Sequence, residues 1–180
     1  MTPTDTLKHE HQIILLVLDA AEREVRQIRD TGKVRTEKAD KMLDFFRNFA
    51  DRCHHAKEED LLFVKMQERG IPAAGGPIAV MLYEHNEGRQ RVKAVAEALP
   101  QAARGDASAI ASVMDNLSAY VQLLRAHIGK EDNILHPMAD QVFTPEDQQA
   151  LAAEFDRVEA EEMGAGVHER YHQLAHELAG

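Results

Sequence analysis

The chain has 180 residues, and its 31 acidic and 21 basic side chains give a formal charge of −10. The length suits one domain with a sizeable core, and an apolar content of 44% excludes a disordered chain. The negative field disfavours nucleic acid and anionic lipid as partners, because both would be repelled.

Breaks rich in glycine and proline divide the chain into six predicted helices. The third is expected to stop before Pro100, because a proline inside a helix removes a backbone hydrogen bond. The fifth is expected to begin at Thr144-Pro145, since threonine caps helices and proline suits their first position. The predicted ranges are 5–30, 36–69, 77–99, 107–140, 145–163 and 167–178.

Apolar residues recur at heptad spacing along the first, third and fourth predicted helices. The fourth, for example, carries Val113, Tyr120 and Ile134 at one heptad position. Such seams are typical of a left-handed antiparallel helical bundle. We therefore expect an all-α fold with a four-helix bundle in residues 1–142. One or two further helices in residues 143–180 are expected to pack on that bundle as a C-terminal extension.

Two segments, 54–62 and 127–135, share the pattern H-x-x-K-E-[ED]-x-x-L. A Glu-His pair stands in the helix before each of them, at residues 10–11 and 84–85. The chain therefore contains an internal duplication of a Glu-His helix followed by an H-x-x-x-E helix. A histidine and a glutamate four residues apart lie on one helix face, so both can reach a single ion.

Several of these polar residues stand where a bundle seam would normally carry leucine or isoleucine: His11, His85, His127 and Glu131. An unpaired carboxylate in such a core is strongly destabilising. A divalent cation removes that penalty and turns the same side chains into a source of stability. Nitrogen and carboxylate ligands without thiolate suit iron, manganese or zinc, and two adjacent carboxylate-bridged ions fit the core of a bundle.

The order of these motifs resembles the hemerythrin-like HHE cation-binding family over residues 7–140. The resemblance implies an up-down four-helix bundle around two iron ions, which are bridged by an oxo group and by carboxylates. The ligand types alone also allow manganese or zinc. The resemblance assigns Glu58 and Glu131 as the bridging carboxylates. The metal ligands that it implies are His11, His54, Glu58, His85, His127 and Glu131.

One ligand of the oxygen-carrying hemerythrins has no counterpart here, because Met81 stands one turn before His85, where the carriers have a second histidine. The missing ligand could be water, His55, Glu59 or a residue of the C-terminal arm such as His168. An incomplete ligand set leaves open coordination positions and favours reactivity toward small molecules over oxygen carriage.

The neighbours His54 and His55 compete for the same role. Helical phase favours His54, which shares a helix face with Leu43 and Ala50. The face of His55 includes Asp44, so this histidine is expected to face solvent.

Two other sets of polar residues have weaker predicted roles. Glu10 and Glu84 lie about 100° around the helix from the adjacent histidines, and we expect them at the surface or hydrogen-bonded to a ligand. His168, His172 and His176 form a row on the last helix, which we interpret as a polar face.

These features predict a non-haem di-iron protein that binds or reacts with oxygen, peroxide or nitric oxide, or that senses oxygen or iron, as in a stress response. One alternative is an oxidoreductase or repair enzyme that breaks down peroxide or nitric oxide or supplies iron to iron–sulfur centres. Another is a metal-free helical interaction module. The expected partner is a small diatomic or peroxide ligand, and neither nucleic acid nor a membrane.

The predicted location is the cytoplasm. Cys53 is the single cysteine, so no internal disulfide can form, which suits a reducing compartment. No apolar run is long enough to cross a bilayer, and the first ten residues lack the apolar core of a signal peptide.

Overall fold

The computed structural model describes residues 1–164 and 166–180, and within these the chain forms helices and no strand. The predicted all-α class is confirmed. None of the described helices is long and apolar enough to cross a membrane. The π-helical elements, labelled η, interrupt or end the α-helices. The elements are α1 (Pro3–Thr31), α2 (Thr36–Phe45), η1 (Phe46–His55), η2 (Glu58–Leu62), α3 (Phe63–Glu68), α4 (Pro77–Ala103), α5 (Ala107–Lys130), η3 (Glu131–Leu135), α6 (His136–Val142), α7 (Pro145–Val158), η4 (Glu159–Met163) and α8 (Val167–Ala179).

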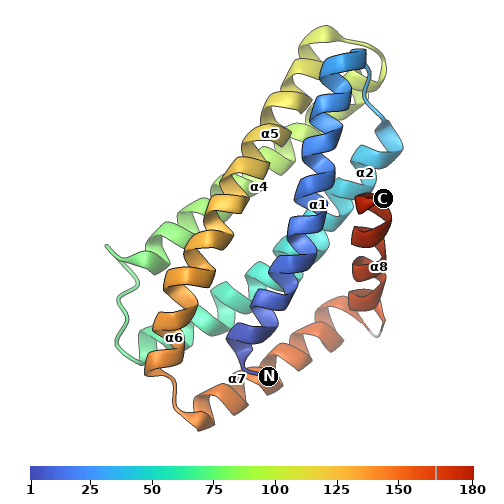
Figure 1. Cartoon of the computed structure of the whole chain (residues 1–180). Coiled ribbons are helices and arrows are strands. Elements are labelled where there is room, and N and C mark those ends of the chain that lie inside the picture. Colours follow the sequence, from blue (N-terminus) through green and yellow to red (C-terminus); the bar gives the residue numbers. More distant parts are fainter. Residues whose placement is uncertain (165) are drawn as a thin grey trace.

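The long helices run alongside one another (Figure 1). The most extensive helix–helix contact joins α4 and α5, and α5 also packs against α1. The second helical stretch lies against α4 through α2 and η1. After α6 the chain turns back, so that α7 contacts α1 and η2 while α8 contacts α1 and α2. The C-terminal helices therefore cover the first two helical stretches.

Two apolar clusters form the core, and a buried polar layer separates them along the helices. On α1, Leu7 belongs to one cluster and Ile14 to the other, with His11 between them. On α4, Met81 and Val92 flank His85 in the same way. The predicted seams of these helices are thus buried on both sides of the polar layer.

The predicted end of the third helix at Pro100 is wrong, because α4 continues to Ala103. Pro100 cannot donate a backbone hydrogen bond and so weakens this last turn. Leu99 and Ala102 on either side of the proline are both buried, and their burial offsets the lost bond. The helix then ends before Gly105, whose φ of 89° is accessible to glycine at little cost.

The prediction that Ile134 lies in a seam is also wrong, because its side chain is 53% exposed. The next two residues, Leu135 and His136, are buried instead. The π-helical turn η3 causes this change, since its wider turn shifts the helical phase that a regular heptad pattern assumes.

The predicted start of the fifth helix is confirmed by a capping box. The Thr144 hydroxyl accepts a hydrogen bond from the backbone N–H of Asp147, and the Asp147 carboxylate accepts one from the backbone N–H of Thr144. Arg69, just after α3, donates two hydrogen bonds to the same carboxylate, from Nε and Nη2. These contacts fix the direction in which α7 returns across the other helices.

Substitution of Leu151 tests whether α7 unfolds together with the rest of the chain. It is buried in the apolar cluster that also contains Leu7 and Phe63. Leu151→Ala is expected to lower the free energy of unfolding by about 3 kcal/mol through lost burial and the cavity left behind. The exposed Gln149→Ala in the same helix should change it by less than about 0.5 kcal/mol. Urea denaturation followed by circular dichroism measures both, and a separate early transition confined to Leu151→Ala would show that α7 unfolds independently.

Candidate metal centre

Three π-helical segments coincide with the duplicated H-x-x-K-E motifs. The segment η1 ends in His54 and His55, η2 begins with Glu58, and η3 begins with Glu131. The backbone N–H of Phe63 donates to the carbonyl of Glu58, which closes a five-residue step. Such turns are common at functional sites, because they change which side chains share a helix face.

All six side chains that the sequence suggests as ligands lie in one buried cluster: His11, His54, Glu58, His85, His127 and Glu131. Glu58 lies between two of these histidines. Its Oε1 is 3.4 Å from Nε2 of His54, and its Oε2 is 3.3 Å from Nε2 of His85. One carboxylate therefore faces an imidazole from its own helix and one from α4.

Glu131 repeats this arrangement with the other two histidines. Its Oε1 is 3.1 Å from Nε2 of His127, and its Oε2 is 3.2 Å from Nε2 of His11. The ligand atoms form two compact groups, within each of which all atoms lie within 4.8 Å of one another. Glu58 belongs to both groups. It therefore stands between the His11 side and the His85 side.

The structure adds two further imidazoles to the cluster. His55 is only 4% exposed, and its ring stacks on that of His85 with centroids 3.9 Å apart. The prediction that His55 faces solvent is wrong, because η1 shifts the helical phase on which it relied. His136 is fully buried, stacks on His11, and has its Nε2 3.8 Å from Oε1 of Glu58.

Sequence reasoning did not identify His136. His136 follows Glu131 by five residues. In a regular α-helix the two side chains would lie about 140° apart around the axis. In η3 the backbone N–H of His136 instead donates to the carbonyl of Glu131. A signal was present all the same: aligning the two motifs pairs His136 with Phe63, at a position that is buried in both halves.

Each of the four predicted histidine ligands is oriented by a carboxylate. Because a carboxylate can only accept, Nδ1 carries a proton and donates it, and Nε2 is the ring nitrogen that faces the centre. This pattern is the one found for metal-binding histidines. The pairs are His54 with Glu10 at 2.8 Å, His127 with Glu84 at 2.9 Å, His85 with Glu59 at 2.7 Å and His11 with Asp132 at 2.8 Å.

These pairs explain why the duplicated motif has an acidic residue directly after its central glutamate. Glu59 and Asp132 both stand at the position after the central glutamate, and each binds a histidine of the other repeat. Glu10 and Glu84 bind histidines of their own repeat. Glu59, suggested above as a ligand, therefore holds His85 from outside the centre.

The lysine of the motif orients the outer carboxylates. Lys57 is fully buried, and its ammonium donates to Glu10 and to Glu159 of η4. Lys130 donates to Glu84 in the same way, but its side chain is 38% exposed. His168 also reaches this outer layer, with Nε2 3.4 Å from Oε1 of Glu10. His168 therefore lies next to Glu10, outside the two groups of ligand atoms around Glu58 and Glu131.

The centre contains buried polar atoms that no group in the described part of the chain satisfies. Both oxygens of Glu58, both oxygens of Glu131, Nε2 of His11 and both ring nitrogens of His136 lack a hydrogen-bond partner. Leaving such atoms buried and unpaired is strongly unfavourable. Imidazole nitrogens and carboxylate oxygens without sulfur are the donor set that iron, manganese and zinc accept. The residues present therefore fit metal ions of this kind.

The pKa values of the buried histidines also indicate that the centre needs positive charge. Burial favours the neutral form of His11, but its hydrogen bond to Asp132 and the nearby negative charge of Glu131 outweigh burial and raise its pKa to about 10. For His85, Glu58 and Glu59 likewise outweigh burial and raise the pKa to about 9. In the metal-free protein, protons on imidazoles thus balance the buried carboxylates.

The two motif lysines offer a matched pair of substitutions. Lys57→Met leaves Glu10 and Glu159 without their buried cation and is expected to destabilise the fold by about 3 kcal/mol. Lys130→Met removes a half-exposed pair, which should cost less than about 1 kcal/mol. Denaturant titration of both variants measures the difference. Equal losses would show that burial of the Lys57 ammonium has no special role.

Comparison with known proteins agrees with this geometry. The sequence model of the hemerythrin HHE cation binding domain matches residues 2–139. Uncharacterized proteins of Mycobacterium bovis and of Mycobacterium tuberculosis are each 21% identical over 164 residues, which is 91% of this chain. The chain spans 64% of the length of these relatives. No solved structure gives a significant match. Because the family match covers most of its length, the chain belongs to the hemerythrin HHE cation-binding domain family.

Proposed function

We propose that the chain holds two iron ions in this centre and binds or reacts with a small ligand such as oxygen, peroxide or nitric oxide, or senses oxygen or iron. The observation that carries the proposal is the set of four unpartnered oxygens of Glu58 and Glu131 at the meeting point of buried imidazoles. A metal pair supplies the positive charge that these oxygens need. Iron is the metal that the family and the donor set together favour.

The proposed ligands divide into two triads of histidines that share Glu58 and Glu131. From the contacts described above, His11, His54 and His136 would hold one ion, and His55, His85 and His127 would hold the other. Glu58 and Glu131 would serve both. With His55 and His136 included, the ligand set no longer lacks a member. An incomplete ligand set therefore no longer supports reactivity toward small molecules.

The size of the ligand follows from burial. When bound, a pair of iron ions supplies one-electron and two-electron chemistry toward oxygen, peroxide or nitric oxide. The side chains of this protein keep the centre dry, since each proposed ligand is at most 4% exposed. The outer carboxylates hold the imidazoles in position. Such an enclosed site suits molecules of two or three non-hydrogen atoms.

We further propose that the helices of residues 1–142 adopt the up-down four-helix arrangement of the family, and that residues 143–180 form a separate C-terminal extension. The extent of the family match supports this division. The return of α7 and α8 along α1 supports it as well.

Metal analysis tests the proposed centre. The purified protein is expected to contain two metal ions per chain, and its iron-loaded form should absorb in the near ultraviolet. His127→Ala should lower the content by about one ion per chain, because Glu131 then loses an imidazole beside it. The exposed His176→Ala is the control and should leave the content unchanged. A folded wild-type protein that takes up no metal would refute the proposal.

Metal uptake by the metal-free protein should release protons at neutral pH. His11 and His85 are protonated there, with pKa values of about 10 and about 9, and a metal requires their free nitrogens. Affinity should therefore rise from pH 6.5 to pH 8, because fewer protons compete. Calorimetric titration with zinc in two buffers of different ionisation enthalpy counts the released protons. Uptake without proton release, and with an affinity independent of pH, would contradict this assignment.

A further inference from the structure

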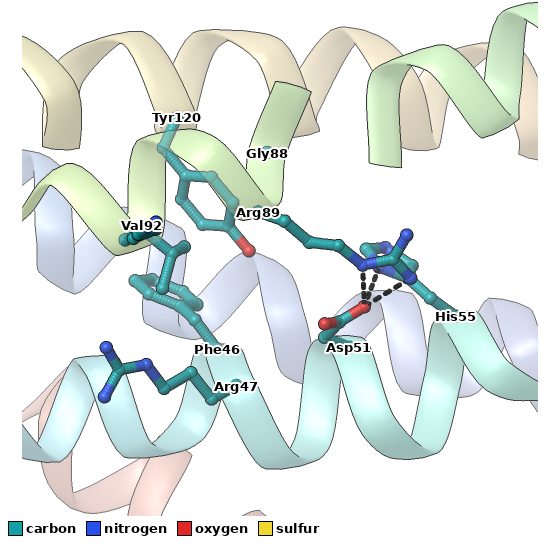
Figure 2. A pocket seen from close by; sticks show the side chains of 9 residues that line it. Phe46, Arg47, Asp51, His55, Gly88, Arg89, Val92 and Tyr120 are labelled. Atoms are coloured by element: carbon teal, nitrogen blue, oxygen red, sulfur yellow. Dashed lines mark hydrogen bonds and ion pairs between the residues drawn. The ribbon is translucent and has the colours of Figure 1, made fainter. Parts of the chain in front are cut away.

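A pocket with a volume of about 250 Å³ lies between η1, α4 and α5, directly beside the candidate metal centre (Figure 2). Phe46, Val92 and the ring of Tyr120 give it buried apolar walls. Its inner end reaches His55, one of the imidazoles of the centre. The exposed residues Arg47 and Lys93 also line it, and they mark the side open to solvent. The pocket therefore leads from the surface toward the centre.

The charges around this pocket are positive, although the whole protein carries a formal charge of −10. Arg47, Arg89 and Lys93 line it, against the single carboxylate of Asp51. That carboxylate already accepts a hydrogen bond from Nε of Arg89 at 2.8 Å. Arg47 forms no ion pair with any described residue, and Lys93 has only Glu97, 3.7 Å away at the surface. A local excess of cations in an acidic protein attracts anions.

The hydroxyl of Tyr120 adds a polar group without a partner. It makes no hydrogen bond within the described residues, although the side chain is almost completely buried. In Figure 2 it points into the space beside the Arg89 side chain. Gly88 allows the ring to lie there, since a Cβ at this position would be 3.3 Å from Cε2 of Tyr120. A phenol placed in this way can donate to an acidic ligand group.

Arg89 connects the pocket with the histidines of the centre. Its Nε donates to Asp51, which faces Nδ1 of His55, and its Nη2 donates to Glu59, which holds His85. An anion in the pocket would thus lie against the residues that orient two of the six imidazoles.

We propose that this pocket binds a small organic anion with a flat apolar body, such as an aromatic carboxylate. The walls match a ring, and the cations together with the Tyr120 hydroxyl match its acidic group. The volume lies just below the usual range for ligand sites, which begins at about 300 Å³, and this limits the ligand to roughly ten non-hydrogen atoms. Binding does not require the metals, so this proposal stands separately from the proposed di-iron function.

Benzoate is the probe for this site. Calorimetric titration of the full-length protein, as purified, should show saturable binding of one benzoate per chain. Benzyl alcohol, which has the ring without the charge, and acetate, which has the charge without the ring, should each bind at least about fivefold more weakly. A lack of saturable benzoate binding, or equal binding of benzyl alcohol, would overturn the proposal.

Paired variants locate the site. Removing both cations at the open side, Arg47→Gln with Lys93→Gln, should weaken benzoate binding about fivefold. The control is Arg52→Gln with Arg91→Gln, which removes two cations from the same helical stretches outside the pocket and should leave affinity unchanged. Metal content, measured on the same samples, should not change in either variant. Equal weakening in both would show general attraction by surface charge and overturn the proposal.

Tyr120→Phe tests the hydroxyl that borders the pocket. Because this hydroxyl has no partner in the described part of the chain, its removal should leave the thermal unfolding midpoint unchanged while weakening benzoate binding. Unchanged affinity in a folded Tyr120→Phe variant would overturn its assigned role as a donor to the ligand.

Discussion

Two buried carboxylates at the middle of the protein determine which charged groups must surround them. Glu58 and Glu131 are fully buried, and no group in the described chain donates a hydrogen bond to any of their four oxygens. Such a core is stable only if positive charge is brought to it. Histidines meet that need in either state, by carrying protons or by binding cations. The outer carboxylates and lysines then balance the histidines. The arrangement is a set of alternating charges that extends from the centre to the surface.

The internal duplication makes this set of charges depend on both halves of the chain. Glu59 of the first half holds His85 of the second, and Asp132 of the second holds His11 of the first. Neither half could orient its own histidines completely without the other. The duplicated pattern therefore encodes mutual positioning in addition to a repeated helical hairpin. This explains why the position after each central glutamate is acidic, a feature that ligand spacing alone leaves unexplained.

The sequence predicts the helices and the six central side chains well, because both depend on regular α-helical spacing. Three of its errors share one physical cause. Ile134 and His55 were placed on the wrong faces, and His136 was not considered, because all three lie in or next to π-helical turns. These turns shift the helical phase, and no simple residue pattern predicts them. Pro100 is a different case. There the burial of Leu99 and Ala102 outweighs a local preference that sequence reasoning took as decisive.

The two repeats are not identical, and the differences between corresponding residues make the two sides of the centre unlike. Glu10 is buried beneath the C-terminal helices, where Lys57, Glu159 and His168 gather around it. Its counterpart Glu84 is paired with a half-exposed lysine near the surface. Aligning the motifs also sets His55 against Ile128, so the imidazole that borders the pocket has no equivalent on the other side. One half of the centre is therefore sealed by the C-terminal arm, while the other lies next to a cationic pocket. Because metal ions respond to the charge and water around their ligands, two ions held here would differ in reactivity even with matching ligand sets.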